Sequence, residues 1–523
     1  MKFFESRDEG WVALGAFAVA GAVALLDLRT ILSHFMVDDS FYYLEIARNV
    51  SLGKGFTFDG LHATNGFQPL FQLLLVPVFW LTTDNEAAIR VAKLLEALIF
   101  AVGAVLLYRL VLKWGLGRGA AWMALAVLIL PGPYGHPLAK GLFTGMESGV
   151  NFLMLLLLLH MWQASLRGRD QIPFVVAYGL VIALAFLARL DNIFLIAGLA
   201  AGHGYMLRKG AGPRLSRLLL AAMISVVVCG AYLLWNELQF GNAVPISGRA
   251  HFMVSQRRSA QLLEQGLLPW IRNTAWFVFH LKSVAVLPLL GLILVPALVL
   301  FQRWVARLHS NVWPRDDARA VLLWVLWISS VIRIGYYAVF QQYPGSGVFW
   351  YYVQEVIVIA LCAGVGFRWL FDRLKIERRA EIARLLSLGL LSISLVFILN
   401  TKPVFDWEVA SFEATQEIRG IVSEGDVLGA KDAGVLGYFL PNSVVNLDGL
   451  VNDARYYEYL KAGRVDEYIL QEDIRYLLNL SAPSGTDMLT ALAGAHHVKL
   501  VYASGSPVAS HGNWIYKLYR VIP

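Results

Sequence analysis

Charged residues are scarce in this chain. Asp, Glu, Lys and Arg make up 15% of its 523 residues, and 58% of the residues are hydrophobic. Because a soluble globular protein carries about 25% charged residues, this composition excludes an ordinary soluble protein. An apolar stretch of roughly 20 residues is long enough to cross a bilayer, and many such stretches follow one another here. The sequence therefore predicts a polytopic α-helical membrane protein.

Cysteines and nucleotide-binding motifs are also missing or rare. The two cysteines, Cys229 and Cys362, each lie in an apolar run, so we expect packing residues and no disulfide framework. The sequence has no phosphate loop ending in GKS or GKT and no GxGxxG before a helix, which leaves a nucleotide donor unsupported. His496 and His497 lie in a predicted strand without other ligands at metal spacing. We predict no metal and no cofactor, although a divalent metal is not excluded.

About eleven spans are predicted from apolar length. They are 11–32, 88–112, 119–138, 146–164, 173–190, 192–207, 217–235, 280–302, 319–340, 350–371 and 385–400. The first has no small-residue cleavage site at its end and is interpreted as a retained helix, not a signal peptide. The segment 68–82 contains Pro69 and Pro77 and is too short and too kinked to span comfortably, so we place it in the membrane interface.

The formal charge of +7 follows the membrane topology, because Lys and Arg cluster in alternate short loops. These basic loops lie near residues 113–118, 167–169, 208–217, 303–319 and 373–384. The positive-inside rule places them and the N-terminus in the cytoplasm, and it makes nucleic acid an unneeded explanation. The first loop, 33–87, and everything after residue 400 are then extracytoplasmic, so we expect function on that side.

Two domains are predicted. Residues 1–400 form the transmembrane domain, and residues 401–523 become polar and form a small soluble α/β domain. The tail contains turn signals such as AKDAG, NLDGL and APSGTD. Its strand-like runs SVVNL, HHVKLVYA and WIYKLYRV alternate with the stretch VDEYILQEDIRYLLNL, which we expect to be helical.

Two adjacent carboxylates, Asp38 and Asp39, follow the first span. After them Tyr43, Ile46 and Val50 recur at helical spacing, which predicts an amphipathic helix on the membrane surface. One carboxylate can cap this helix. Because neighbouring residues do not share a helix face, the other can point into a cavity, and ionisable groups at membrane edges often mark function.

Several motifs give the chain a family resemblance. The paired acids, GKGFTFDG, TNGFQPL, TGMESG, LARLDN, ELQFGNAVPIS and GVLGYFLPNSVVNLDGLVN resemble GT-C-fold glycosyltransferases. These include protein mannosyltransferases, aminoarabinose transferases and, most closely, arabinofuranosyltransferase-like bacterial members. In the LARLDN corner Leu190 stands where the family usually has proline.

The resemblance implies a function and a site. It implies an inverting transfer of a sugar from a polyprenyl-phosphate carrier to a glycan, lipid or protein acceptor outside the bacterial inner membrane. One acid of the pair would be the general base. We favour Asp38 as the base, because it lies nearer the end of the first span, and Asp39 as the helix cap. The expected donor phosphate ligands are Arg189, Arg249, Arg333 and Lys140, since a leaving phosphate needs fixed positive charge. The expected site-lining residues are Glu147, Asp191, His251, Tyr42, Asn65 and Gln68.

Simpler roles stay open for several of these residues. Arg189 could pair with Asp191 to stabilise the corner, and Arg249 could lie on a solvated loop. Glu147 has capping-box spacing from Thr144. A lipid-sugar transporter or flippase is the rival function, although inverted repeats and mid-membrane charges are not evident.

Overall fold

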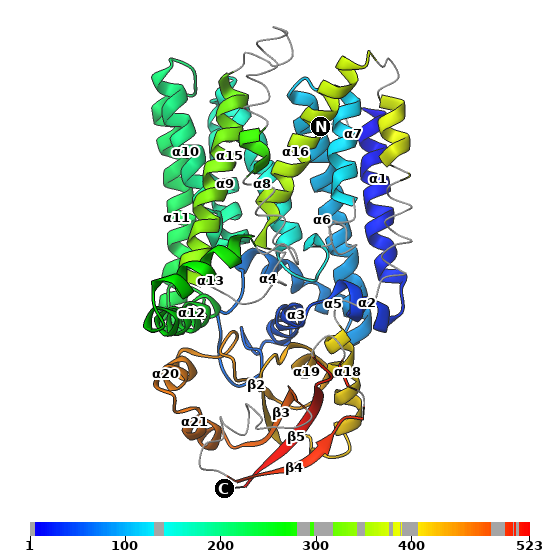
Figure 1. The fold of residues 1–523 in the computed structure, drawn as a ribbon, viewed down its shortest axis with the longest axis vertical. Helices are drawn as coiled ribbons and strands as arrows, with labels where there is room; N and C mark the ends of the chain where they lie inside the picture. The colour runs from blue at the N-terminus through cyan, green and yellow to red at the C-terminus, as the bar shows by residue number, and fades with distance from the viewer. Residues whose placement is uncertain are drawn as a thin grey trace.

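A computed structural model describes residues 6–129, 141–279, 293–297, 317–341, 351–375, 380–387, 389, 406–482, 497–505, 507–508 and 512–522. Long helices stand side by side in the upper part of Figure 1, and a smaller region built around a β-sheet lies at their lower end. The fold is thus a polytopic helical membrane protein with a small C-terminal α/β domain, as the composition predicts.

The helical bundle matches most of the predicted spans. Its helices are α1 (Arg7–Gly21), α6 (Asn85–Lys113), α7 (Gly117–Ile129), α8 (Ser148–Leu166), α9 (Ile172–Ala188), α10 (Ile193–Arg208), α11 (Leu215–Phe240), α15 (Asp317–Tyr336) and α16 (Val353–Arg373). Among the described residues, seven helical segments are long and apolar enough to cross a membrane, and α7 and α9 are shorter apolar helices. The predicted spans 280–302 and 385–400 fall mostly outside the described residues.

The first span ends earlier than predicted. After α1 and the 3₁₀ turn η1 (Ala22–Leu25), the chain is extended at Leu26, and a separate helix α2 (Leu28–Phe35) begins. The carboxylate of Asp27 accepts hydrogen bonds from the backbone N–H of Thr30 at 3.0 Å and from its hydroxyl at 2.6 Å. The prediction of one helix over 11–32 was wrong because this local N-cap starts a new helix inside the apolar run.

Short helices lie between the bundle and the sheet. They are α3 (Asp38–Ser51), α4 (Pro69–Leu75), α5 (Val78–Leu81), α12 (Ile246–Glu264) and α13 (Leu267–Phe279). The predicted surface helix is α3. The segment 68–82 forms only α4 and α5, which are separated at Pro77, so it makes no helix of membrane-spanning length.

The C-terminal region contains a five-stranded mixed sheet. Its elements are α18 (Asp406–Ile418), β1 (Val427–Ala430), α19 (Gly434–Phe439), β2 (Val444–Asn446), α20 (Ala454–Ala462), α21 (Val465–Gln471), β3 (Ile474–Ser481), β4 (His497–Ala503) and β5 (Ile515–Ile522). The strand order is β2-β1-β3-β5-β4. Strands β2, β1 and β3 are parallel, whereas β5 runs antiparallel to β3 and β4.

Three strand predictions are confirmed by β2, β4 and β5, but one helix prediction is only half right. The stretch VDEYILQEDIRYLLNL starts as α21 and continues as β3. Asp473, between them, has a left-handed backbone with φ of 48°. The following apolar run pairs with β1 on one side and β5 on the other, so strand pairing outweighs its helical propensity.

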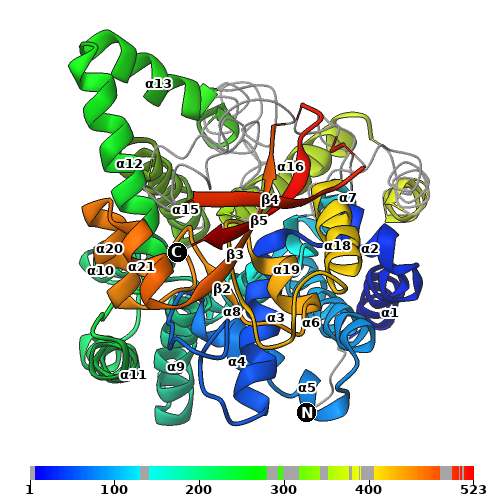
Figure 2. The same ribbon diagram turned by 90° about the horizontal axis from the view of Figure 1, so that it is seen from below.

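The C-terminal region shares its core with α3. One apolar cluster contains Phe41 and Ile46 of α3 together with Tyr438 of α19 and Leu478 of β3. Seen from below in Figure 2, α19 and the sheet lie over α3. The approach is so close that a Cβ added at Gly434 would lie 2.0 Å from the backbone oxygen of Asp38. The region therefore forms one wall of whatever site α3 carries.

Candidate active site

The two acids at the start of α3 point to different places. The Asp38 carboxylate accepts hydrogen bonds from the backbone N–H groups of Gly434 at 2.9 Å and Val435 at 2.8 Å, where α19 begins. Asp39 lines a cavity on the other side. Neither acid caps α3, because its N-cap is Val37 and no side chain bonds there. This arrangement is the reverse of the expected one, in which Asp38 would face the cavity.

The cavity has a volume of about 720 Å³. It lies between α3, the 3₁₀ corner η3 (Leu190–Asn192), the loop before α4, the start of α12 and the end of α15. The predicted site residues on its wall are Asp39, Tyr42, Gln68, Glu147, Arg189, Asp191, Arg249 and His251. The structure thus brings together residues from four of the sequence motifs with two residues of α12.

The remaining predicted site residues lie elsewhere. Asn65 supports the wall from behind, because its amide group donates to the Asn242 carbonyl at 3.1 Å and accepts from the Ile246 N–H at 3.0 Å. Arg333 is 2% exposed and lies outside the cavity lining. Lys140 falls outside the described residues.

Arg189 and Arg333 belong to a buried ion-pair network. Arg189 bonds Asp191 at 2.9 Å and also pairs with Glu147. Arg333 lies 3.4 Å from the other oxygen of Asp191 and pairs with Glu355. The pairing of Arg189 with Asp191 that was considered from the sequence is therefore present, and it coexists with a place on the cavity wall.

Arg249 is the more accessible arginine of the cavity. Its guanidinium lies 4.3 Å from the ring centroid of Tyr457 and bonds the side chain of Asn242. Its distance to Glu458 is 3.9 Å, and about a third of the Arg249 side chain is exposed. His251, on the same helix, also lines the cavity, and burial lowers its pKa while the charge of Asp448 opposes that shift.

A buried ion pair that was not predicted from the sequence, Lys93 with Glu96, lies beside the turn before Glu147. The Lys93 ammonium of α6 donates to the carbonyls of Phe35 at 2.6 Å and Phe143 at 2.9 Å and to Glu96 at 2.9 Å. Glu96 in turn accepts from the N–H of Gly145. The pair thereby ties the end of α2 to the turn before Glu147. Two charges three residues apart in an apolar span were the available signal, because such charges are costly in a membrane.

Gly145 and Tyr43 complete the link between that turn and α3. Gly145 has φ of 77°, and a Cβ there would lie 2.6 Å from the Cβ of Ser40, so glycine is required. The Tyr43 hydroxyl donates to Glu147 at 3.0 Å and accepts from the N–H of Gln68 at 3.0 Å. Asp39 therefore lies in the first two turns of α3, which are held by the Gly145 turn and by the hydrogen bonds of Tyr43.

The electrostatics favour a proton-accepting role for Asp39. Burial raises its pKa well above the ordinary range, and the nearby charges of Asp38, Asp448, Asp432 and Glu147 raise it further. Burial also raises the pKa of Asp38 to about 6, although hydrogen bonds from Val435 and Gly434 oppose the shift. A buried carboxylate of raised basicity at a cavity wall can act as a general base. Among the described residues, no cluster of three or more His, Cys, Asp or Glu side chains could hold a metal ion.

Comparison with known proteins identifies the fold. No protein-family profile matches the chain, and no curated protein matches its sequence. Among solved structures, ArnT from Cupriavidus metallidurans bound to undecaprenyl phosphate matches 98% of each chain with a TM-score of 0.58 and 14% identity. Its apo state gives 0.57 at the same identity and coverage. The Archaeoglobus fulgidus oligosaccharyltransferase, in complex with Zn and sulfate, matches 96% of this chain and 80% of its own with a TM-score of 0.53 and 12% identity.

The chain has the GT-C fold. The resemblance inferred from the sequence motifs is confirmed at the level of the fold. At identities of 14% and 12% the likeness extends to the fold alone, so the function rests on the residues of the site.

Proposed function

We propose that this protein is a membrane glycosyltransferase that moves a sugar from a polyprenyl-phosphate carrier to an extracytoplasmic acceptor. The observation that carries the proposal is the Asp39 carboxylate on the wall of a cavity that also exposes Arg249. The fold adds support, because ArnT, a solved structure of the same fold, is bound to undecaprenyl phosphate.

The proposed reaction is a single displacement with inversion. The acceptor hydroxyl transfers its proton to Asp39 while its oxygen bonds to the anomeric carbon. The bond between that carbon and the phosphate oxygen breaks, and its electron pair leaves with the polyprenyl phosphate. General-base assistance of this kind contributes roughly 10²–10⁴-fold to the rate.

Asp39 is the better base of the pair. Both carboxylate oxygens of Asp38 already accept backbone hydrogen bonds from α19, which leaves Asp38 engaged in holding two parts of the chain together. Asp39 faces the cavity and has a raised pKa. We therefore reverse the roles inferred from the sequence and propose Asp39 as the base and Asp38 as a positioning residue.

Arg249 is the best candidate for the donor phosphate. The network around η3 contains two arginines and three carboxylates, namely Arg189, Arg333, Glu147, Asp191 and Glu355. Its arginines are thus already neutralised by their own partners. Among the described residues, the carboxylate paired with Arg249 is that of Glu458, 3.9 Å away, and the planar guanidinium at the cavity suits bidentate binding of a phosphate. Lys140 remains a predicted phosphate ligand.

A direct assay separates the proposed transferase from a flippase. Purified protein in liposomes receives an undecaprenyl-phosphate-linked sugar and an extract of envelope acceptors, and released undecaprenyl phosphate is measured. We expect release in the wild type and a loss of about 10²-fold in Asp39→Asn. If the intact lipid-linked sugar changes leaflet and none is cleaved, the protein is a flippase and the transferase proposal fails.

A further inference from the structure

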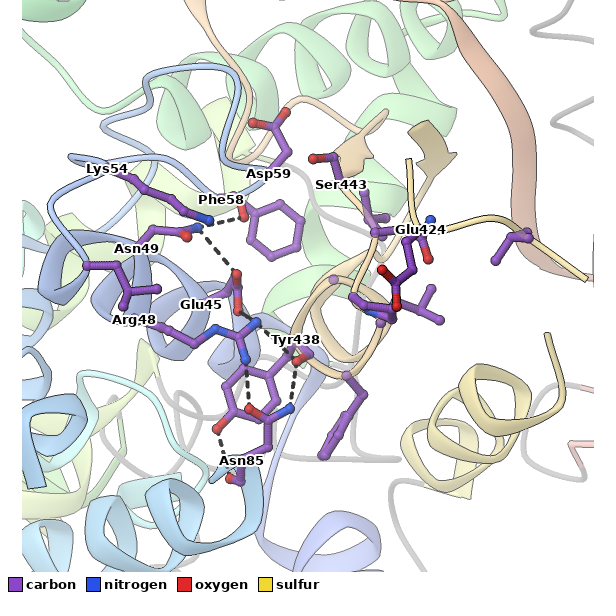
Figure 3. A pocket seen from close by; sticks show the side chains of 18 of the residues that line it. Glu45, Arg48, Asn49, Lys54, Phe58, Asp59, Asn85, Glu424, Tyr438 and Ser443 are labelled. Atoms are coloured by element: carbon purple, nitrogen blue, oxygen red, sulfur yellow. Dashed lines mark hydrogen bonds and ion pairs between the residues drawn. The ribbon is translucent and has the colours of Figure 1, made fainter. Parts of the chain in front are cut away.

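A second cavity, of about 630 Å³, lies on the other side of α3. Figure 3 shows its side chains converging from α3, the loop that follows it, the start of α6, and the C-terminal region around α19. It shares no lining residue with the first cavity, the one of about 720 Å³ that Asp39 lines. Helix α3 separates the two, since Asp39 and Tyr43 face one cavity while Glu45, Arg48 and Asn49 face the other.

The charges in the second cavity balance. Its charged lining residues are the acids Glu45, Asp59 and Glu424 and the bases Arg48, Lys54 and Arg419, three of each sign. A site for a phosphate or a polyanion would carry an excess of positive charge. The balanced lining instead suits a ligand without net charge that offers many hydrogen-bonding groups.

The polar side chains are held in place before any ligand arrives. Arg48 donates to the Asn85 side chain at 2.7 Å and to the Tyr438 carbonyl at 3.3 Å, and it pairs with the buried carboxylate of Glu45. Asn49 donates to the Thr57 carbonyl at 2.9 Å. Figure 3 shows the Arg48 side chain between Asn85 of α6 and Tyr438 of α19, which it links to α3. Such preorganisation lowers the entropy cost of binding.

The lining combines the groups that recognise sugars. The exposed lining side chains of Lys54, Arg419 and Glu424 can bond hydroxyl groups as donors or acceptors. A peptide anchor would need a deeper apolar pocket than this lining provides.

We propose that the second cavity is a carbohydrate site that binds neutral sugar units of an extracytoplasmic glycan, apart from the sugar that reacts. The proposal goes beyond the transferase activity and does not depend on it. Its ligand class is a neutral oligosaccharide.

Direct binding to the full-length protein tests the site without any donor present. The protein is placed in lipid nanodiscs, which avoids sugar-headed detergents, and neutral tetrasaccharides of arabinose, mannose and N-acetylglucosamine are tested by saturation-transfer NMR. We expect at least one of them to bind with a Kd of about 1 mM or tighter. Mannose 6-phosphate and an unrelated tetrapeptide should bind at least tenfold more weakly.

Two variants of lining residues and one control variant test whether the tetrasaccharide binds in the second cavity. Ser443→Trp fills the cavity and should weaken binding more than tenfold, whereas Ser423→Trp, at an exposed serine outside the lining, should not. Glu424→Gln changes an exposed lining side chain without changing its size, so it keeps the test valid if Ser443→Trp misfolds; it should weaken binding about threefold. The proposal is overturned if no tetrasaccharide binds, if the phosphate or the peptide binds better, or if Glu424→Gln and a folded Ser443→Trp bind like the wild type. Failure of sugar transfer would leave this result unaffected.

Discussion

At the scale of single residues, Asp38 and Asp39 show that a shift of one position along a helix gives a carboxylate entirely different partners. They are adjacent in sequence, yet Asp38 bonds the start of α19 and Asp39 lines the cavity of about 720 Å³. The sequence predicts that one of two neighbouring carboxylates faces a cavity, because they point about 100° apart on a helix. It could not show which one, since the deciding partner lies 396 residues later in the chain.

The first prediction separates these two residues. Asp39→Asn removes the base but keeps the size of the side chain, so we expect single-turnover rate to fall about 10²-fold or more with donor affinity little changed. Asp38→Asn should mainly lower thermal stability, because it removes a charged acceptor from two buried N–H groups. Rates, donor binding and melting temperatures of both variants decide the roles, and an active Asp39→Asn variant would exclude Asp39 as the base.

The second prediction concerns pH. A base works only when unprotonated, and burial together with Asp38, Asp432, Asp448 and Glu147 raises the pKa of Asp39. Activity should therefore be lost as pH falls through this raised pKa, well above the value of about 4 of an ordinary aspartate. The log of kcat/KM plotted against pH should show this limb. Residual activity of Asp39→Asn should lack it, and an identical limb in that variant would point to another group.

At the scale of elements, local signals decided where helices start and long-range pairing decided where strands lie. The Asp27 cap that opens α2 was readable from sequence, because aspartate is among the preferred N-cap residues. The change from α21 to β3 was not readable, because β3 is defined by its partners β1 and β5. The three strands that were predicted are rich in β-branched and aromatic residues, which favour a sheet and could be recognised in the sequence without knowledge of the partner strands.

The third prediction tests the contact between α3 and α19. In Gly434→Ala the new methyl would meet the Asp38 backbone oxygen at 2.0 Å, so α19 must move away. Overpacking of this kind costs about 1–3 kcal/mol, and we expect a lower melting temperature and a lower rate. Gly420→Ala is the matched control, because nothing lies within 4 Å of a Cβ there. Equal melting temperatures for the two variants would mean that the contact is looser than the structure indicates.

At the scale of the whole molecule, the sequence accounted for the fold better than for the site. Apolar length and basic loops predicted most spans because both depend on the bilayer and not on distant contacts. The site depends on η3, α12 and the C-terminal region meeting α3, so its residues could be named from motifs but their orientations could not be derived. Arg333 is the clearest case, since a buried cation near a span end was expected to bind phosphate and instead pairs with Glu355 behind the wall.

The fourth prediction concerns topology. Lys54 and Glu424 are exposed and line the same second cavity, so they must lie on one side of the membrane. In a background with Cys229 and Cys362 replaced, Lys54→Cys and Glu424→Cys should both react with an impermeant thiol reagent on intact cells. Arg208→Cys, in a basic loop, should react only after permeabilisation. Labelling in the opposite pattern would invert the predicted orientation.

The hydrogen bonds from Gly434 and Val435 to Asp38 also bear on how the protein is made. The ribosome releases α3 and Asp38 early, but the N–H groups that bond Asp38 emerge only after nearly four hundred further residues have been translated. Until then α3, the helix that carries Asp39, lacks the packing of α19 against it. The site can therefore be completed only late in synthesis. A nascent chain halted before α19 contains the proposed base, Asp39, but lacks the N–H groups that bond its neighbour Asp38.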